Sequence, residues 1–501
     1  MRRAERTRRS GILLHPTSLP GESGIGDFGP WAYRFADFLA EGGMQLWQIL
    51  PLGPPGAGHS PYQAYSSIAC NPLLLSLETL AERGWLPPDS LRAAETYPES
   101  AVDFERVIPR KLGLVARAAE AFRHSPSDPL RGEFLQFCDR HRFWLDPFAR
   151  FAALRALNGN AAWTGWTVGA PASEQDILDQ KFIQFELFRE WGLLRRYCAG
   201  RGIALVGDLP IFVAHDSADV WANPELFDLD GRGLPRAVAG VPPDYFSETG
   251  QCWGNPLYRW DEMERTGYRW WVERLRVLLE QVDVIRIDHF RGFEKYWEIP
   301  AGSPTAAGGR WVAGPGSRFF EAMERALGPL PFIAEDLGYI TPEVEALRDA
   351  WRFPGMRVLQ FAFGDEAADN PHKPFNFARN SVAYTGTHDN DTTAGWFEGM
   401  DRPGAAVEIE RALRYMGVGA EGAAWGLVRT LFASVADTVV IPMQDALCLG
   451  SGARMNTPAT VGGNWGWRLR GDQMTPELAE RLRALNRIYG RLPEGPAGGQ
   501  A

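Results

Sequence analysis

Cysteine and lysine are both scarce in this chain of 501 residues. The five cysteines are odd in number, widely scattered and without a CxxC pair, which excludes a disulfide framework and a cysteine-rich zinc site as organising features. Lysine occurs at only four positions, so arginine supplies nearly all of the positive charge. We therefore expect a reducing, cytoplasmic location and no metal.

Long apolar runs and nucleotide-binding loops are also missing. No stretch approaches the roughly 18 apolar residues of a membrane span, and no apolar signal region follows the basic N-terminus. The glycine-rich stretches lack phosphate-binding spacing after a strand. A net charge of −10 disfavours nucleic acid and anionic membranes as partners. These absences predict no cofactor, and they suit a neutral, hydroxyl-rich ligand.

Apolar and aromatic residues are plentiful instead. The hydrophobic fraction of 45% is ample for a large core. The chain contains 19 Trp, 13 Tyr and 28 Phe residues, most of which we expect to be buried. Those left at the surface are suited to stacking on sugar rings.

Short apolar or β-branched runs, separated by segments with helical periodicity, predict eight parallel strands. This count is what a closed (β/α)₈ TIM barrel needs, and the tail is too short for a C-terminal β-sandwich. No internal repeat or low-complexity linker divides residues 1–501, so we predict a single catalytic domain. The expected strands begin at Gly11, Leu46, Ile203, Val282, Pro331, Val358, Val382 and Val439.

Two long connections interrupt the strand rhythm. Residues from about 72 to 197 show helical periodicity without a convincing strand, which predicts a helical insertion subdomain. Residues from about 210 to 256 are rich in Pro and Gly, which predicts a loop region at the active site.

Three acidic residues lie at or just after the C-terminal ends of predicted strands: Asp288, Glu335 and Asp389. The C-terminal strand ends hold the active site of a β/α barrel, and retaining glycosidases need a carboxylate nucleophile beside a carboxylic acid. An acid at a strand end can also cap a helix or pair with an arginine. Three of them on barrel positions favour glycoside chemistry over that structural alternative.

Neighbouring residues suggest how the three acids differ. Arg286 projects to the same side of its strand as Asp288, so it should hold an anionic nucleophile ionised. Glu335 follows an apolar run and should have a raised pKa, as an acid/base needs. His388 beside Asp389 is suited to hydrogen-bonding sugar hydroxyls as positive charge develops on the ring.

The three acids stand among several longer motifs. These are Gly11-Ile-Leu-Leu-His-Pro-Thr-Ser-Leu-Pro20, Ser60-Pro-Tyr-Gln63, Asp208-Leu-Pro-Ile-Phe-Val, Pro242-Pro-Asp-Tyr-Phe-Ser-Glu-Thr-Gly-Gln251, Arg286-Ile-Asp288-His-Phe, Ala334-Glu-Asp-Leu-Gly338, Thr387-His-Asp-Asn390, Arg454-Met-Asn-Thr-Pro458 and Gly463-Asn-Trp465. They resemble the motifs of the 4-α-glucanotransferases (amylomaltases or disproportionating enzymes), glycoside hydrolase family 77 of the α-amylase clan. The resemblance covers nearly the whole chain and implies that Asp288 is the nucleophile, Glu335 the acid/base and Asp389 the transition-state stabiliser.

The resemblance also implies a substrate-binding set and a flexible loop over the active site at residues 242–251. Aromatic members of this set fit stacking on glucosyl units, although each alone is more often a packing residue. The set comprises Tyr62, Asp208, Asp244, Tyr245, Phe246, Trp253, Arg286, His388 and Asn456.

The activity implied is transfer of an α-1,4-glucan segment to the 4-hydroxyl of glucose or a malto-oligosaccharide, with net retention by double displacement. Donors would be α-1,4-glucans and malto-oligosaccharides, and the enzyme would be a monomer or a homodimer. Two alternatives remain at this point. One is an α-glucan hydrolase with the same three carboxylates, and the other is a non-catalytic glucan-binding barrel.

Overall fold

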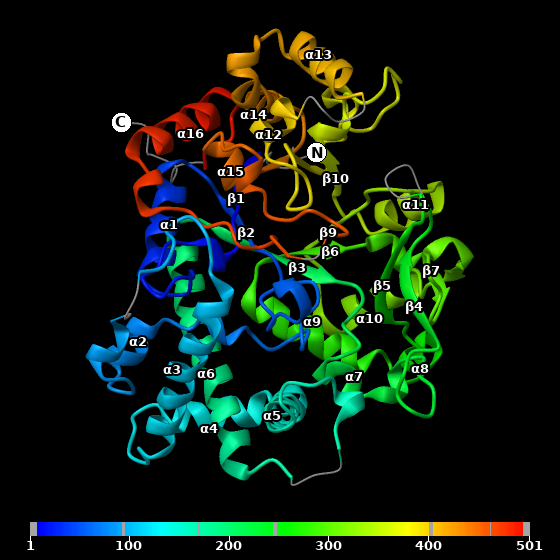
Figure 1. Cartoon of the computed structure of the whole chain (residues 1–501). Coiled ribbons are helices and arrows are strands. Elements are labelled where there is room, and N and C mark those ends of the chain that lie inside the picture. Colours follow the sequence, from blue (N-terminus) through cyan, green and yellow to red (C-terminus); the bar gives the residue numbers. More distant parts are fainter. Residues whose placement is uncertain are drawn as a thin grey trace.

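Eight parallel strands form a closed barrel at the centre of the molecule (Figure 1). The computed structural model describes residues 8–92, 96–167, 171–243, 248–399, 404–460 and 462–493. β1 pairs with β2 on one side and with β12 on the other, which closes the ring and confirms the predicted barrel. The barrel strands are β1 (Arg9–Leu13), β2 (Leu46–Gln48), β3 (Ala204–Pro210), β6 (Val284–Asp288), β9 (Phe332–Ala334), β10 (Gly355–Val358), β11 (Ser381–Tyr384) and β12 (Thr438–Pro442).

Apolar side chains fill the inside of the barrel. Leu13, Val206, Ile333, Val382 and Val440 belong to one buried cluster contributed by different strands. Their neighbours one position along each strand face outward and pack against the helices. The barrel is therefore a packed core.

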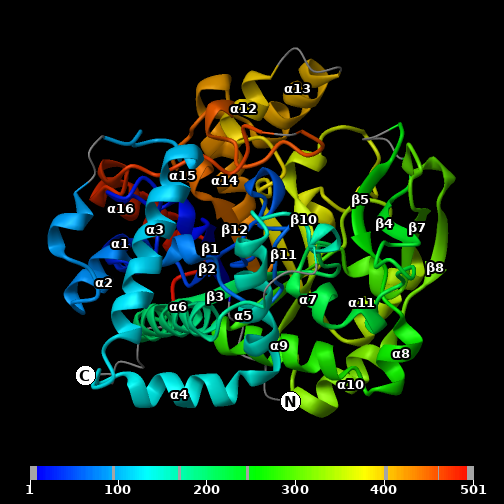
Figure 2. The same ribbon diagram turned by 60° about the horizontal axis from the view of Figure 1, so that its bottom comes forward.

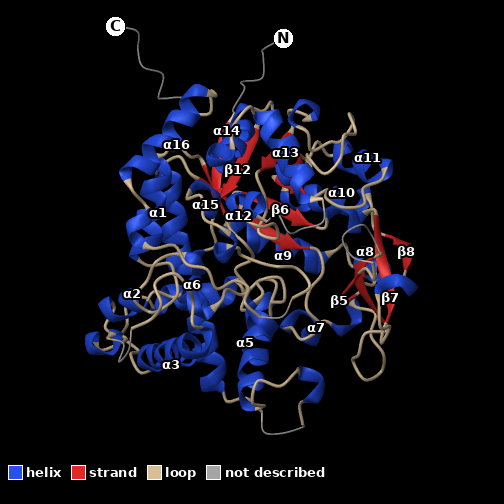
Figure 3. Ribbon diagram, turned by 45° about the horizontal axis from the view of Figure 1, so that its top comes forward, coloured by secondary structure: helices blue, strands red, loops and turns tan. Residues whose placement is uncertain are grey.

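Helices surround the barrel, as Figure 3 shows by colour. Those between β2 and β3 form one group, and in Figures 1 and 2 this group lies on the opposite side of the barrel from β4, β5 and β7. The helices are α1 (Pro30–Glu41), α2 (Leu77–Glu82), α3 (Phe104–Arg123), α4 (Arg131–Arg140), α5 (Arg142–Leu157), α6 (Glu174–Gly200), α7 (Ala218–Ala222), α8 (Trp260–Arg265), α9 (Arg269–Gln281), α10 (Ser317–Leu327), α11 (Pro342–Ala350), α12 (Thr393–Glu398), α13 (Ala405–Met416), α14 (Ala423–Ala433), α15 (Met443–Ala446) and α16 (Pro476–Ile488).

A second, antiparallel sheet was not predicted from the sequence. Its order is β5-β4-β7-β8, and two of its strands lie within the segment that the sequence suggested was loop. Gly240 shows why the strand signal is weak: a Cβ there would lie 2.1 Å from the Gln251 carbonyl oxygen, so the close pairing of β4 with β5 requires glycine. The strands are β4 (Ala237–Val241), β5 (Gln251–Pro256), β7 (Lys295–Pro300) and β8 (Arg310–Ala313).

The predicted strand starting at Val358 is misplaced. The observed β10 ends at Val358, and the following apolar residues form the 3-10 helix η9 (Leu359–Phe361). A short apolar run does not by itself distinguish a strand from a buried helical turn. The connection from β10 to β11 contains only 3-10 helices over residues 359–380, so the strict strand–helix alternation that we expected fails here.

No helix within the described ranges is long and apolar enough to cross a membrane.

Candidate active site

Asp288 lies at the C-terminal end of β6 and is held by a buried arginine from the same strand. The Nη1 atom of Arg286 is 3.0 Å from Asp288 Oδ1 and 2.8 Å from both carboxylate oxygens of Asp208, on the adjacent β3. Arg286 is only 4% exposed, and Asp208 also 4%. One guanidinium thus links two carboxylates from neighbouring strands.

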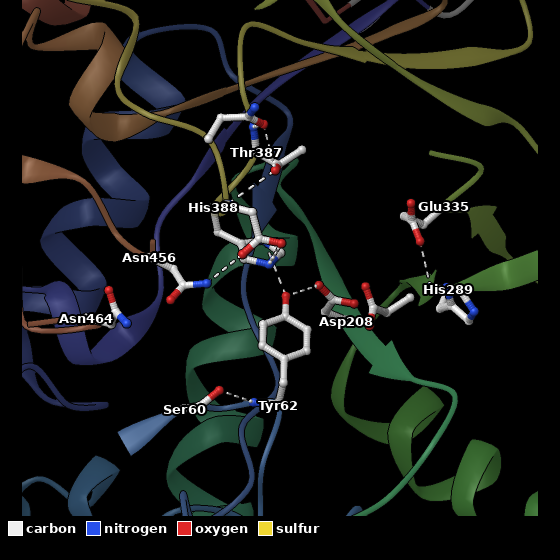
Figure 4. A network of polar contacts seen from close by, with 12 residues as sticks. Ser60, Tyr62, Asp208, His289, Glu335, Thr387, His388, Asn456 and Asn464 are labelled. Atoms are coloured by element: carbon white, nitrogen blue, oxygen red, sulfur yellow. Dashed lines mark hydrogen bonds and ion pairs between the residues drawn. The ribbon is translucent and has the colours of Figure 1, made fainter. Parts of the chain in front are cut away.

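Tyr62 extends this network across the mouth of the barrel (Figure 4). Its hydroxyl donates to Asp208 Oδ2 at 2.8 Å and lies 3.3 Å from His388 Nδ1. The Tyr62 ring also stacks on the His388 ring, with centroids 4.9 Å apart and an interplanar angle of 20°. Burial and the charge of Asp208 raise the pKa of Tyr62 well above 10, so the phenol remains a donor.

His388 and Asp389 form an ion pair on the loop after β11. His388 Nε2 is 3.4 Å from Asp389 Oδ2, and Asn456 Nδ2 donates to Asp389 Oδ1 at 2.7 Å. Burial opposes a charged His388, but the charge and hydrogen bond of Asp389 raise its pKa. Burial likewise opposes ionisation of Asp389, but the charge and hydrogen bond of His388 lower its pKa. Each member of the pair therefore favours the charged form of the other.

Glu335 follows β9, directly beside β6. Its carboxylate accepts backbone hydrogen bonds from His289 at 2.7 Å and Leu337 at 3.0 Å. Residue Ile287 pairs with Ala334 in the barrel register, so Asp288 and Glu335 occupy equivalent positions one residue further along adjacent strands. This register places a second carboxyl group next to the first.

The two carboxyl groups differ in acidity. Burial raises the pKa of Asp288 to about 6 and that of Glu335 to about 7. Arg286 lowers both pKa values, but of these two carboxyl groups it hydrogen-bonds Asp288 alone. We therefore assign the higher pKa to Glu335. The raised pKa expected for Glu335 is present. The expected ionised state of Asp288 holds only above pH about 6, because Arg286 is shared with Asp208 and burial outweighs it.

The structure brings together most of the predicted substrate-binding residues. Tyr62, Asp208, Arg286, His388 and Asn456 belong to the continuous polar network described above.

Trp253, on β5, packs edge-on against the His289 ring, with centroids 4.8 Å apart. Through His289, whose backbone N–H binds Glu335, Trp253 lies near the carboxyl groups. Asp244, Tyr245 and Phe246 fall outside the described residues.

Other contributors to the site were missed. Arg454 Nη2 donates to the Asp389 carbonyl at 2.6 Å, and Trp465 lies 6.0 Å from both the Tyr62 and the His388 ring centroids. Trp465 and His289 both have positive φ, which a non-glycine residue rarely adopts outside functional sites. Trp465 and Arg454 stand in motifs quoted above for the resemblance, which is the signal that could have identified them.

Within the ranges that the structure describes, no group of three or more His, Cys, Asp or Glu side chains could hold a metal ion. The chemistry available at this site is that of a carboxylate, a neighbouring carboxylic acid and a histidine–carboxylate pair.

Comparison with known proteins agrees with this geometry. A sequence profile described as 4-alpha-glucanotransferase matches residues 14–475. The chain belongs to the 4-alpha-glucanotransferase family. It is 48% identical to a 4-alpha-glucanotransferase of Synechocystis sp. (97% of this chain and 98% of the relative) and 46% identical to one of Thermus thermophilus (97% and 100%).

A solved structure extends the likeness to three dimensions. The amylomaltase from Streptococcus agalactiae, solved in complex with acarbose, superposes with a TM-score of 0.92 at 37% identity, covering 97% of this chain and all of that one. The resemblance to 4-alpha-glucanotransferases seen in the motifs therefore extends over the barrel and its insertions.

Proposed function

We propose that this protein, an enzyme of the 4-alpha-glucanotransferase family, moves a segment of an α-1,4-glucan to the 4-hydroxyl of glucose or of a malto-oligosaccharide. Asp288 attacks C1 of the donor, and Glu335 gives its proton to the departing glycosidic oxygen. Glu335 then takes the proton of the acceptor hydroxyl, whose oxygen displaces Asp288 from C1. Two inversions give net retention.

One observation supports these roles above all others. The two adjacent carboxyl groups have different surroundings: Asp288 accepts a hydrogen bond from a guanidinium, whereas Glu335 accepts hydrogen bonds from the backbone N–H groups of His289 and Leu337. The guanidinium favours the anionic form of Asp288, which is the form that attacks carbon. Without such a partner, the pKa of Glu335 stays near the pH at which the enzyme works, so Glu335 can give and take a proton.

Asp389 and His388 would stabilise the transition state. His388 and Asn456 hold the Asp389 carboxylate in place, so the group can hydrogen-bond sugar hydroxyls without rearranging as charge develops. Asp389 is 50% exposed, which leaves one side of its carboxylate available to a ligand.

The cysteines support a cytoplasmic location. All five are free, and Cys252 and Cys448 are exposed, a state that a reducing compartment preserves.

Maltotriose distinguishes the proposed transferase from both alternatives. We expect purified protein to convert it into glucose, maltose and a ladder of longer chains, with a constant number of reducing ends. Rising reducing ends would identify a hydrolase. Unchanged maltotriose would identify a non-catalytic binding protein.

Asp288→Asn and Glu335→Gln test the assigned roles. Each should lower kcat by at least about 1,000-fold, because the group lost forms or breaks a bond in the transition state. Binding of maltotriose by calorimetry should change little. Activity within tenfold of the parent in either variant would contradict the assignment.

A further inference from the structure

Three aromatic rings form an outer platform beside the loop that follows Glu335: Trp297, Trp311 and Tyr339. Tyr339 is 63% exposed, and Trp297 and Trp311 are partly exposed. The Trp311 and Tyr339 rings are nearly parallel, with an interplanar angle of 22° and centroids 6.3 Å apart. Trp297 meets Trp311 edge-on at 5.0 Å. Aromatic rings that lie together at a surface form an apolar patch, and such patches often mark binding sites.

The platform is held rigidly from below. Trp297 and Trp311 are directly opposite each other in the β7–β8 pair, and Trp297 Nε1 donates to the Ala306 carbonyl at 2.9 Å. The Arg291 guanidinium lies 3.8 Å from the Trp311 ring centroid and hydrogen-bonds the Tyr339 carbonyl. Arg291 is itself only 4% exposed. A ligand that stacks here would order few side chains on binding.

The platform residues lie close to the proposed catalytic carboxyl groups along the chain. Tyr339 stands four residues after Glu335, and the chain between them is tied to the acid/base by the hydrogen bond from Leu337 N. Four residues span at most about 14 Å. Arg291, which binds the Tyr339 carbonyl, stands three residues after Asp288. Both catalytic strands therefore lead directly into the platform.

We propose that Trp311 and Tyr339 bind a distal glucosyl unit of the leaving or acceptor chain of an α-1,4-glucan. This inference rests on the proposed function, because Glu335 faces the oxygen that joins the donor to the leaving chain. A chain extending past Glu335 on that side meets the platform, where the apolar faces of sugar rings stack on aromatic faces. Short acceptors do not reach it.

A protein partner fits the platform less well. Specific protein interfaces bury roughly 800 Å² on each side, and three partly covered rings of about 150–250 Å² each expose less than that. A narrow, flat aromatic surface is a better match for a single oligosaccharide chain.

Length-dependent kinetics test the platform. Tyr339→Ala and Trp311→Ala should raise KM for maltoheptaose as acceptor by about three- to tenfold, the equivalent of one lost aromatic contact, while KM for glucose as acceptor and kcat stay unchanged. Tyr339→Phe keeps the ring and should behave as the parent. Phe375→Ala removes a ring that is 62% exposed in the β10–β11 connection and should change neither constant.

Equal effects of Tyr339→Ala on both acceptors, no effect on either, or the same shift in Phe375→Ala would overturn the proposal. Calorimetric binding of maltoheptaose gives a result independent of turnover. Suppose that the parent does not transfer glucan, but that Tyr339→Ala binds maltoheptaose more weakly than the parent does. The proposed function would then be wrong, and the platform would still be a glucan-binding site. Unchanged affinity in both alanine variants would exclude the platform.

Discussion

At the scale of single residues, Arg286 determines the electrostatics of the site. It is buried, and it donates to Asp208 and Asp288 at the same time. A buried charge is tolerated when its partners form hydrogen bonds and ion pairs with it. Removing one partner leaves an uncompensated buried charge, which destabilises the folded protein. The carboxylate of Asp208 therefore fixes the guanidinium that in turn orients the proposed nucleophile.

Tyr62→Phe removes the hydroxyl between Asp208 and His388 while keeping the stacked ring. We expect kcat to fall by about tenfold, since a hydrogen bond to a charged group contributes roughly 1.5 kcal/mol or more. Thermal stability should change little. Tyr489→Phe, which removes a hydroxyl bonded to Arg429 away from the site, is the matched control. A kcat equal to the parent's in Tyr62→Phe would show that the hydroxyl link is not used.

The pH dependence of kcat/KM follows from the two raised pKa values. In the proposed mechanism the active form has Asp288 ionised and Glu335 protonated, so activity should fall as pH drops below about 6 and as pH rises above about 7. The two limbs belong to the coupled pair rather than to either residue alone. A pH profile of maltotriose disproportionation measures them. A flat profile between pH 4 and pH 9 would contradict the assignment.

At the scale of elements, the loop from β11 to α12 positions His388 and Asp389. Asp445, on α15 and 1% exposed, anchors both ends of this loop: it accepts from the Thr385 hydroxyl and from both the backbone N–H and the hydroxyl of Thr393, each of the latter at 2.7 Å. The loop geometry therefore depends on a carboxylate that is more than 50 residues away in the sequence.

Asp445→Ala should lower the free energy of unfolding by about 2–4 kcal/mol, because buried hydroxyl and N–H donors lose their acceptor. It should also lower kcat, since Asp389 is no longer held in place. Urea denaturation and maltotriose kinetics measure the two effects. Thr393→Ser keeps the hydroxyl and should resemble the parent. Parental kcat and parental stability together in Asp445→Ala would refute the anchoring role.

At the scale of the whole molecule, the C-terminal segment closes the bottom of the barrel. Arg491 is fully buried and donates to two backbone carbonyls at the start of barrel strands. One is that of Arg9, the first residue of β1, and the other is that of Asp437, directly before β12. It also donates to the carbonyl of Phe432, in the last turn of α14, and to those of Ser434 and Ala436, which follow that helix. Residues at this face of a β/α barrel serve stability rather than catalysis.

Arg491→Met should reduce the free energy of unfolding by at least about 3 kcal/mol, because several buried carbonyls lose a charged donor. The kcat of the protein that remains folded should equal the parent's. Arg487→Met, at a side chain that is 60% exposed, should cost less than about 0.5 kcal/mol. Similar stability of the two variants in urea would contradict the proposed closure.

The helical segment between β2 and β3 packs against the helices of the barrel. Trp191, on α6, is 1% exposed and donates from Nε1 to the Gln281 carbonyl at the end of α9. We infer that this insertion and the barrel unfold as one unit, because a buried contact of this kind cannot be kept by either part alone.

The sequence by itself determined the barrel class, seven of the eight strand positions to within two residues, and the three acids at strand ends, because apolar periodicity and strand termini are local properties. Tertiary structure decided the rest. β4 and β5 are visible only through pairing, since Gly240 is a strand residue because β5 and β7 both pair with it. The pKa of Asp288 depends on Arg286, whose guanidinium hydrogen-bonds both Asp208 on β3 and Asp288 on β6. The position of Asp389 depends on Asp445 and Asn456. Contacts between distant segments, unlike periodicity, leave no signal in a single chain.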